Sequence, residues 1–309
     1  MTLAIRRRNE ETSNREKGLI FPGQNLHGKP LMDLEGYYAE VASAYDRIAT
    51  EYDETVGRSL VSRHAKRLAA DVIAQVSPPG GWLLDVGCYT GTEGLLLAQR
   101  GFRVVGVDLS PKMIELSRAK AKRWRLADRT RFEVARASDL SSLRAAALGP
   151  FDTIYSVYGT LNLEPRVDLF KESIHPLLKP HGALVVGLLN PTVLYELLLG
   201  PVALRFDGYR KLAKRRVKTR IGAGDASVSS FLYSSRQFAS LLRPEFALER
   251  ILGVHILYPP PRGSAGGGKG LWWVARAMDR IEQHLEDRSP FSYLGLFTLM
   301  IFRRSHSSA

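Results

Sequence analysis

Short apolar runs alternate with stretches of helical periodicity along most of the chain. Apolar side chains between Tyr38 and Tyr52 recur near i, i+3, i+4 and i+7, which predicts an amphipathic helix, and a second helix is expected over about 60–76. Strands are predicted over 82–86, 102–107, 131–135, 151–157 and 183–188, with helices over 94–100 and 111–124 between the first three. Strands and helices that alternate at this spacing form βαβ units, so we expect a parallel sheet with helices on both faces.

The pattern changes after Asn190. Residues 191 to about 226 are expected to form inserted helices with a basic tail, because apolar positions precede eight basic residues and one acid over 205–220. A helix over 235–242, a strand over 246–258, a helix over 271–285 and a strand over 291–302 are then predicted. The two late strands are expected to pair as an antiparallel hairpin at one edge of the sheet. The predicted fold is therefore α/β, with a seven-stranded mostly parallel sheet, an antiparallel edge hairpin and an inserted helical cap.

The composition is that of one large globular domain. The chain has 309 residues, of which 45% are hydrophobic and 24% charged, so a sizeable core can form without a disulfide or a structural metal. Residues 1–30 are polar and charged and lack hydrophobic periodicity, which predicts a disordered basic arm. We expect a single domain over 31–309, with the insertion at about 191–228.

Cysteine, histidine and long apolar runs narrow the possible chemistry. The single Cys88 excludes an internal disulfide framework and a cysteine-based zinc site, and the seven histidines lack metal-ligand spacing, so no metal is expected. The longest apolar stretch, 183–206, is interrupted at 190–191, 196 and 200–201, which argues against a membrane span. No apolar run follows the arginines at 6–8, so no secretory signal is expected. A cytoplasmic protein fits these features.

A glycine-containing turn follows the first strand. Residues 84–91 read Leu-Asp-Val-Gly-Cys-Tyr-Thr-Gly, and glycine in such a turn lets the backbone approach a ligand closely. The turn lies beyond the carboxyl end of the strand, where ligands bind in open α/β sheets. Asp108 ends the second strand, 21 residues after Gly87, where an acidic side chain can accept hydrogen bonds from both ribose hydroxyls of a nucleoside.

This arrangement resembles motif I and the acidic second motif of the class I S-adenosylmethionine-dependent methyltransferases. It is most similar to the small-molecule group, whose motif I reads Asp-Val-Gly-Cys-Gly-Thr-Gly. The segments 45–53, 151–152 and 178–182 also match that group's layout, and the resemblance covers about residues 38–190. It implies a Rossmann-like fold and S-adenosylmethionine as the cofactor.

The resemblance also implies roles for individual residues. Asp108 would hold the ribose and Asp85 would orient the turn. The other positions implied to contact the cofactor are Gly87, Cys88, Tyr89 and Gly91 at its amino-acid end, Leu109 and Met113 beside the adenine, Ser138 and Asp139 at the adenine edge, Ser156 and Tyr158 facing the methyl group, and Tyr45 and Tyr52 closing over it. Packing roles in the core are the alternative for Leu109, Met113, Tyr45 and Tyr52.

Two positions depart from the family pattern. Tyr89 stands where the family has the middle glycine, so its side chain must point away from the methionine part of the cofactor or pack over it. Arg136 stands where an aspartate often lies near the adenine, and Ser138 or Asp139 is expected to take that place.

Methyl transfer from a sulfonium is an in-line displacement that depends on alignment of the acceptor with the methyl carbon. A neutral oxygen acceptor also needs a base, for which His255 is the candidate, with Tyr158 as a second catalytic candidate. A structural role for His255 is the alternative.

The net charge of +13 attracts nucleic acid, anionic membrane or acidic small molecules without distinguishing them. Residues 156–159 read Ser-Val-Tyr-Gly instead of the Asn/Asp-Pro-Pro-aromatic motif of base-amino methyltransferases, which disfavours nucleic acid. The insertion could cover a hydrophobic acceptor, or its basic part, 205–220, could contact an anionic membrane. We expect a small lipophilic or saccharide-linked acceptor. A non-catalytic cofactor-binding protein of the same fold and a nicotinamide-dependent oxidoreductase remain alternatives, although Tyr89 breaks the Gly-x-Gly-x-x-Gly pattern that the latter needs.

Overall fold

The computed structural model describes residues 33–57, 60–199, 216–221, 227–257 and 272–305. The predicted basic arm over 1–30 lies outside these residues, so it stays a prediction. Among the helices that are described, none is both long enough and apolar enough to cross a membrane.

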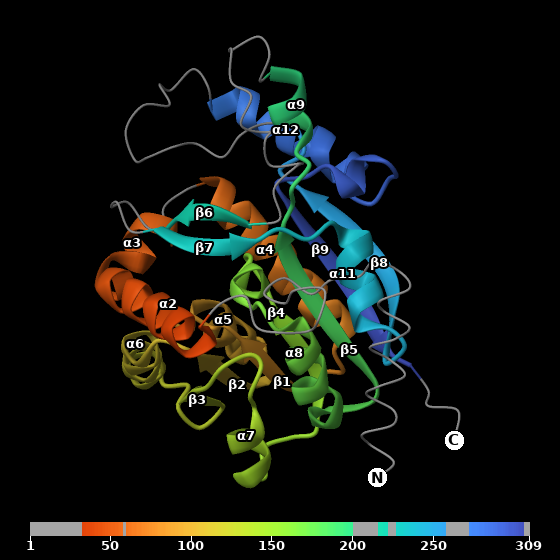
Figure 1. Cartoon of the computed structure of the whole chain (residues 1–309). Coiled ribbons are helices and arrows are strands. Elements are labelled where there is room, and N and C mark those ends of the chain that lie inside the picture. The colour runs from red at the N-terminus through yellow and green to blue at the C-terminus, as the bar shows by residue number, and fades with distance from the viewer. Residues whose placement is uncertain (1–32, 58–59, 200–215, 222–226, 258–271, 306–309) are drawn as a thin grey trace.

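A seven-stranded sheet forms the centre of the fold (Figure 1), with strand order β3-β2-β1-β4-β5-β9-β8. Strands β1 to β5 run parallel to their neighbours, whereas β9 is antiparallel to both β5 and β8. The strands are β1 (Trp82–Val86), β2 (Arg103–Asp108), β3 (Thr130–Val134), β4 (Phe151–Ser156), β5 (Leu178–Leu189), β8 (Phe246–Val254) and β9 (Phe297–Arg304). The expected mostly parallel sheet with an antiparallel edge hairpin is confirmed.

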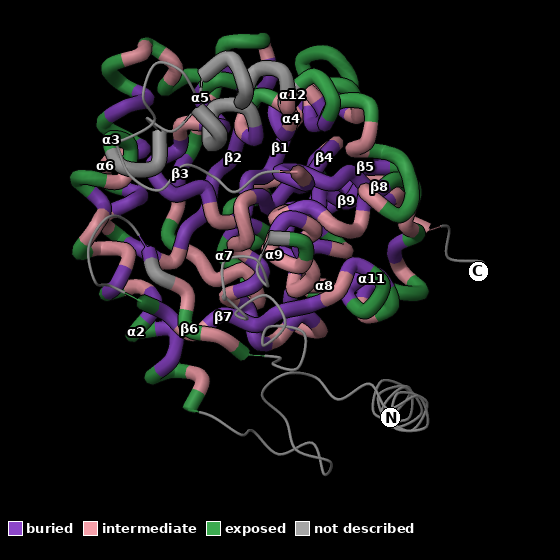
Figure 2. The backbone as a smooth tube through the Cα atoms, turned by 90° about the horizontal axis from the view of Figure 1, so that it is seen from above, coloured by how far each residue is buried: buried purple, intermediate pink, exposed green. Residues whose placement is uncertain are grey.

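Helices cover both faces of the sheet, because successive strand residues point to opposite faces. Leu83 of β1 packs in a cluster with α4 (Leu60–Val76) and α5 (Thr92–Gln99), whereas its neighbour Leu84 packs in the cluster on the other face. The second cluster includes residues of α2 (Leu34–Ile48), α8 (Val167–Ile174) and α11 (Ser235–Leu242). Figure 2 shows the strands as a buried layer between these helices.

Local signals in the sequence explain several helix boundaries. Helix α6 (Pro111–Arg123) begins after Ser110, whose hydroxyl accepts the backbone N–H of Met113, with proline at the first helical position. Helix α11 begins with a capping box between Ser234 and Gln237. The remaining α-helices of the described chain are α3 (Tyr52–Gly57), α7 (Ser141–Ala145), α9 (Leu194–Leu199) and α12 (Trp272–Leu285).

The insertion differs from the expected helical cap. It contains the short helix α9 and then an antiparallel hairpin of β6 (Arg216–Arg220) and β7 (Ser227–Phe231), which forms a separate two-stranded sheet. Charged side chains alternate with Val217 and Thr219 in β6, and alternation of this kind with β-branched residues is a strand signal. The predicted helix is therefore present at α9, the prediction was wrong for 216–220, and residues 200–215 lie outside the described part of the chain. Most of the basic segment over 205–220 lies outside the described residues, and Arg216 and Lys218 are exposed on β6.

The largest of the other differences from the predicted boundaries are at the starts of two strands, by five and six residues. Strand β5 begins at Leu178, ahead of the predicted residue 183. The last strand begins only at Phe297, because a 3-10 turn over Phe291–Tyr293 precedes it.

Asn162 joins the hairpin to the main sheet. It is 2% exposed in the short 3-10 helix η2 (Thr160–Leu163) that follows β4. Its amide NH2 donates to the carbonyl oxygen of Phe231 in β7 at 2.7 Å, and its amide oxygen accepts the N–H of Leu189 in β5 at 2.7 Å. One side chain therefore fixes the loop after β4 between the sheet and the hairpin.

We expect Asn162→Ala to lower the free energy of unfolding by about 2–3 kcal/mol, because it leaves a buried N–H and a buried carbonyl without their partner. Urea denaturation of the purified protein measures this loss. Ser43→Ala, at an exposed position on α2, is the control and should change stability by less than about 0.5 kcal/mol. A loss below that value for Asn162→Ala would show that the hairpin is not held through this side chain.

Candidate functional site

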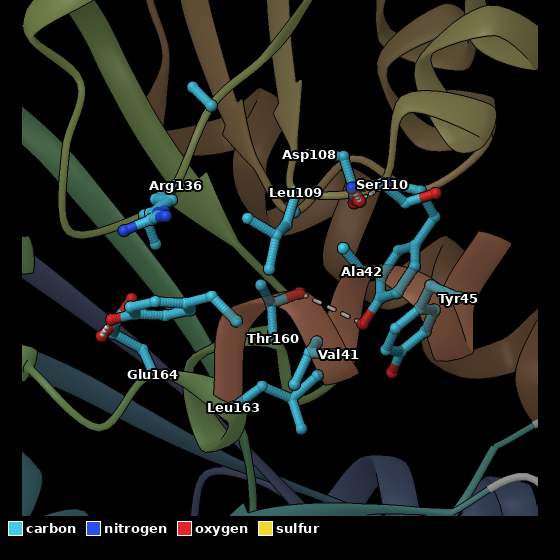
Figure 3. Close-up of a pocket in the computed structure, with 15 residues that line it drawn as sticks. Val41, Ala42, Tyr45, Asp108, Leu109, Ser110, Arg136, Thr160, Leu163 and Glu164 are labelled. Atoms are coloured by element: carbon cyan, nitrogen blue, oxygen red, sulfur yellow. Dashed lines mark hydrogen bonds between the residues drawn. The ribbon is translucent and has the colours of Figure 1, made fainter. Parts of the chain in front are cut away.

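A pocket opens at the carboxyl ends of β1, β2, β3 and β4, beneath helix α2 (Figure 3). This is the edge at which open α/β sheets bind ligands. Its lining combines apolar side chains with two carboxylates, one at the end of β2 and one in the loop after β4. The residues that line it are Tyr38, Val41, Ala42, Tyr45, Gly87, Tyr89, Asp108, Leu109, Ser110, Ala135, Arg136, Ala137, Thr160, Leu163 and Glu164.

The glycine turn after β1 is fixed by backbone contacts and by close packing. The N–H groups of Gly87 and Cys88 both donate to the carbonyl oxygen of Val107, at 2.8 and 2.9 Å. Gly87 has φ +81°, and a Cβ at this position would lie 2.1 Å from the side-chain methyl of Thr160. Only glycine fits here, because the loop after β4 packs directly on the backbone of the turn.

Tyr89 packs over the pocket. Its φ is +50°, so tyrosine adopts the left-handed conformation that glycine usually takes, at a cost of about 1–2 kcal/mol. Its ring stacks on Tyr52 with centroids 5.0 Å apart and lies 5.6 Å from Tyr45. The Thr160 hydroxyl donates to the Tyr89 hydroxyl at 3.2 Å. The turn therefore has, at Tyr89, the backbone conformation that glycine usually adopts, and an aromatic cluster of Tyr45, Tyr52 and Tyr89 covers it.

Asp108 links the turn to the start of α6. Its carboxylate accepts the N–H of Tyr89 and the N–H of Ser110, both at 2.9 Å, and the residue is 8% exposed. Burial raises the pKa of Asp108 to about 6, against the lowering effect of these two hydrogen bonds. A carboxylate has about four acceptor positions, so two backbone donors leave capacity for the hydroxyl groups of a ligand.

Two further carboxylates hold the N-terminal helices over the pocket. Asp46 of α2 accepts hydrogen bonds from the Ser110 hydroxyl and from the N–H of Lys112 at the start of α6. Asp53 of α3 accepts from the Thr90 hydroxyl at 2.6 Å and forms an ion pair with Lys120. The covering helices are therefore bonded to the turn and to α6.

The opposite end of the pocket is polar. The Tyr38 hydroxyl donates to Oε1 of Glu164 at 2.5 Å, and burial raises the pKa of Glu164. Arg136 donates to both carboxylate oxygens of Glu35 at the start of α2, and its guanidinium lies 4.7 Å from the centroid of the Tyr38 ring. In Figure 3 the labelled Arg136 and Glu164 lie at the side of the pocket away from Tyr45.

The structure brings some of the sequence-predicted site residues into the pocket lining and leaves others outside it. Those in the lining are Gly87, Tyr89, Asp108, Leu109 and Tyr45. Those outside it are Asp85, Cys88, Gly91, Met113, Ser138, Asp139, Ser156, Tyr52, Tyr158 and His255. The roles proposed for all of these residues stay predictions.

Several residues outside the lining support the residues within it. Asp85 is buried below the turn, where burial and the nearby Glu93 raise its pKa. Cys88 and Met113 lie in buried apolar clusters, and Ser156 is fully buried. Gly91 caps α5 and packs against Phe132, since a Cβ there would lie 2.9 Å from its ring.

The two residues predicted at the adenine edge have hydrogen-bond partners within the protein. Ser138 lies 3.0 Å from the Tyr38 hydroxyl, oxygen to oxygen. Asp139 is exposed, and its carboxylate accepts from the N–H and the hydroxyl of Ser141.

The two predicted catalytic side chains lie away from this pocket. Tyr158 lines a second, small apolar pocket, between β4, β5, β9 and helix α4. His255 is 1% exposed at the end of β8, the strand at the far edge of the sheet from β3. Within the described part of the chain, no group of three or more His, Cys, Asp or Glu residues is placed to hold a metal ion.

Sequence reasoning missed Tyr38, Thr160 and Glu164. Tyr38 was placed in the helix by its periodicity but was assigned no role. The other two follow β4 by a few residues, in the loop after a parallel strand where ligand contacts are expected. That position was the available signal, but no spacing rule singles out a side chain within such a loop.

The chain is similar in sequence to known methyltransferases. Residues 83–182 match the family model described as "Methyltransferase domain". The chain is 34% identical over 139 residues to erythromycin 3''-O-methyltransferase of Saccharopolyspora erythraea, which covers 44% of this chain and 42% of that protein. It is 30% identical over 168 residues to demethylmenaquinone methyltransferase of Tropheryma whipplei, which covers 52% of this chain and 61% of that protein. The chain therefore spans about half the length of the curated relatives it matches.

The fold is similar to that of 1,6-didemethyltoxoflavin-N1-methyltransferase of Burkholderia thailandensis, which was solved with 1,6-didemethyltoxoflavin and S-adenosylhomocysteine bound. The TM-score is 0.53 at 19% identity, and the match covers 90% of this chain and 93% of that one. At this identity the likeness shows the shared fold alone.

The raised pKa of Asp108 predicts a pH-dependent effect on stability. The folded state binds the Asp108 proton more tightly than the unfolded chain, so this contribution to stability is present at low pH and is lost as pH rises through about 6. Asp108→Asn has no titratable carboxyl group at this position, so the variant does not lose this contribution to stability as pH rises. We expect the free energy of unfolding of the variant, relative to wild type, to rise by about 1.4 kcal/mol between pH 5 and pH 7.5.

Urea denaturation of both proteins at the two pH values measures this difference. Asp128→Asn, at an exposed position before β3, is the matched control and should run parallel to wild type. If the free energy of unfolding of Asp108→Asn changed with pH as that of wild type does, the result would contradict a buried, proton-binding carboxyl group at this position.

Proposed function

We propose that this chain, a member of the class I S-adenosylmethionine-dependent methyltransferases, transfers the methyl group of S-adenosylmethionine to a small-molecule acceptor. The observation that carries the proposal is the buried Asp108 carboxylate, which lines a pocket beside the glycine turn at the carboxyl ends of β1 and β2. The family membership agrees with this pocket, because the matched segment 83–182 contains both the turn and Asp108.

The pocket residues fit the parts of S-adenosylmethionine. The remaining acceptor positions of Asp108 suit the two ribose hydroxyls, and Leu109 offers an apolar contact to the adenine. The backbone at Gly87 would lie against the methionine part, since no Cβ separates the turn from the pocket. The aromatic cluster of Tyr45, Tyr52 and Tyr89 suits the positively charged end of the cofactor, because aromatic faces attract cations.

The bound cofactor would supply a methyl group that is attached to a sulfonium sulfur. When the acceptor bonds to the methyl carbon and gives up a proton, the sulfur leaves as a thioether. The chain's own residues position the two reactants and exclude water. Alignment of this kind can contribute about 7–11 kcal/mol to lowering the barrier. His255 and Tyr158 lie outside the lining, so the proposal rests on positioning and assigns no base.

The acceptor that we propose is lipophilic or saccharide-linked. The names of two relatives support these classes, one being a methyltransferase of erythromycin and the other of demethylmenaquinone. The hairpin of β6 and β7 lies beside α2 and the loop after β4, as Figure 1 shows, and the Tyr37 hydroxyl of α2 donates to the carbonyl oxygen of Ser229 in β7. It is the element that we propose to shape the acceptor site.

A cofactor-binding protein without transfer activity is the second candidate, and Tyr89 favours it. Its ring lies in the pocket lining at the position where the family has glycine. Turnover of the cofactor distinguishes the two candidates.

Calorimetric titration with S-adenosylmethionine and, separately, with NAD tests the cofactor, using wild type and Asp108→Ala. We expect micromolar binding of S-adenosylmethionine alone, and a loss of at least about tenfold in the variant, because the ribose hydroxyls lose a charged acceptor. Asp128→Ala is the control and should bind like wild type. Binding of NAD alone, or of neither ligand, would contradict the proposal.

Transfer is then measured with a radiolabelled methyl group and two acceptor classes, a hydroxylated macrolide glycoside and a reduced naphthoquinone. A radiolabelled methyl group in the product of either acceptor supports the proposal that this chain is a methyltransferase. Tight cofactor binding without label in any product of a broader acceptor screen would favour the non-catalytic candidate.

A further inference from the structure

Glu164 is a buried carboxyl that the proposed function has not used. It follows the short 3-10 helix after β4, is 3% exposed and lines the pocket at the end opposite the aromatic cluster. Figure 3 shows Glu164 at one side of the pocket, on the same side as Arg136. Burial of a carboxylate is unfavourable unless hydrogen bonds compensate for the lost water, so its position in a pocket wall suggests a role in binding.

Among the described residues, the two short hydrogen bonds to Glu164 go to the same carboxylate oxygen, and a hydrogen bond from the Ser138 side chain also lowers the pKa of the group. Oε1 accepts from the Tyr38 hydroxyl at 2.5 Å and from the backbone N–H of Arg166 at 2.8 Å. These two donors fix the orientation of the carboxyl group. No hydrogen bond from a described residue to Oε2 accompanies them, so Oε2 is the oxygen that a ligand in the pocket would meet.

The adjacent part of the pocket suits an adenine ring. The segment 135–137, which follows β3, lines the pocket together with Leu109 and Leu163. The exocyclic amino group of adenine is a hydrogen-bond donor and needs an acceptor. Arg136, the residue at the place where the family often has an aspartate, cannot serve, because a guanidinium has only donors.

The other candidates at this edge are also committed. Arg136 is paired with Glu35, Ser138 contacts the Tyr38 hydroxyl, and the exposed carboxylate of Asp139 accepts from Ser141. Of the two carboxylates in the pocket lining, Asp108 lies at the end of β2 and is assigned to the ribose, so Glu164 is the other acid that the ligand can meet.

We propose that Glu164 accepts the hydrogen bond from the exocyclic amino group of the cofactor's adenine, with Tyr38 as its positioning residue. The assignment rests on the proposed function and replaces the expectation for Ser138 and Asp139. The carboxyl group that contacts the adenine thus lies in the loop after β4 instead of the loop after β3. No acidic side chain is then needed at position 136, where this chain has arginine.

Glu164→Gln provides a sharp test, because Tyr38 and Arg166 both donate to the Oε1 position. They fix the amide oxygen there and place the NH2 group at the Oε2 position. The variant therefore presents a donor to the ligand where wild type presents an acceptor. Adenine should therefore lose its hydrogen bond to this side chain and bind more weakly, whereas a purine with an oxygen at carbon 6 should gain a hydrogen bond and bind more tightly.

The measurement is the ratio of dissociation constants for S-inosylhomocysteine and S-adenosylhomocysteine, obtained by calorimetry on the full chain. We expect wild type to prefer the adenosyl ligand by roughly tenfold or more, and Glu164→Gln to abolish or reverse that preference. Tyr38→Phe should reduce the ratio part of the way, because it releases one of the two donors that orient the carboxyl group. Asp139→Asn is the matched control and should keep the wild-type ratio.

An unchanged ratio in Glu164→Gln, or a changed ratio in Asp139→Asn, would overturn the assignment while the proposed function stands. Failure of the wild-type chain to bind either ligand would overturn both. A thermal unfolding curve for each variant accompanies the titrations. A ratio compares two ligands on the same folded protein, so a loss of folded fraction affects both constants equally.

Discussion

The Asp108 carboxylate is the group on which the geometry of the site depends. Its two oxygens accept one N–H from the turn after β1 and one from the start of α6, so a single side chain sets the distance between the two loops that face the ligand. The ionised form of this carboxyl group is unfavourable in the folded protein, because burial raises its pKa to about 6. A group that is unfavourable for stability and that lines a pocket is typical of a binding site, whereas a structural role could be filled by a neutral acceptor.

The covering helices are attached to this centre by carboxylates that accept hydrogen bonds from backbone and hydroxyl groups. Asp46 reaches the N-terminal end of α6, Asp53 reaches the turn, and Glu164 receives the hydroxyl of Tyr38 from α2. Bonds of this kind have defined directions, whereas exposed ion pairs contribute little. Helix α2 is therefore held in one orientation over the pocket, and its side chains at 38, 41, 42 and 45 can form a fixed wall.

Much of this arrangement could be predicted from the sequence, and the exceptions have physical causes. Helices α4 and α11 and strand β1 have the predicted bounds, because hydrophobic periodicity and the flanking Pro, Gly and Ser residues are local signals. The Gly87 turn and Asp108 were found because a fixed spacing along the chain reflects the geometry of a βαβ unit. The hairpin β6–β7 was missed because a run of basic residues obscured the alternation in a strand that is paired only locally.

Glu164 could not be predicted by the same means. The role that we propose for it depends on Tyr38, 126 positions away in sequence, and on the pocket wall after β3, which lines the same pocket. No local pattern distinguishes it from a solvated acid in a loop. Tyr89 is a different case, since the sequence flagged the missing glycine but could not say where the ring would go, which depends on Tyr45 and Tyr52.

The two ends of the pocket differ in how freely they can change. The end near Asp108 is built from strand termini and a glycine that admits no Cβ, so its geometry is tied to the sheet itself. The end near Glu164 is built from the loop after β4, which is fixed through Asn162 to the inserted hairpin. A change in the insertion can therefore alter this loop, and with it both Glu164 and Thr160, without disturbing the sheet. This coupling gives the fold a way to vary the contacts at the Glu164 end of the pocket while the Asp108 end stays tied to the sheet.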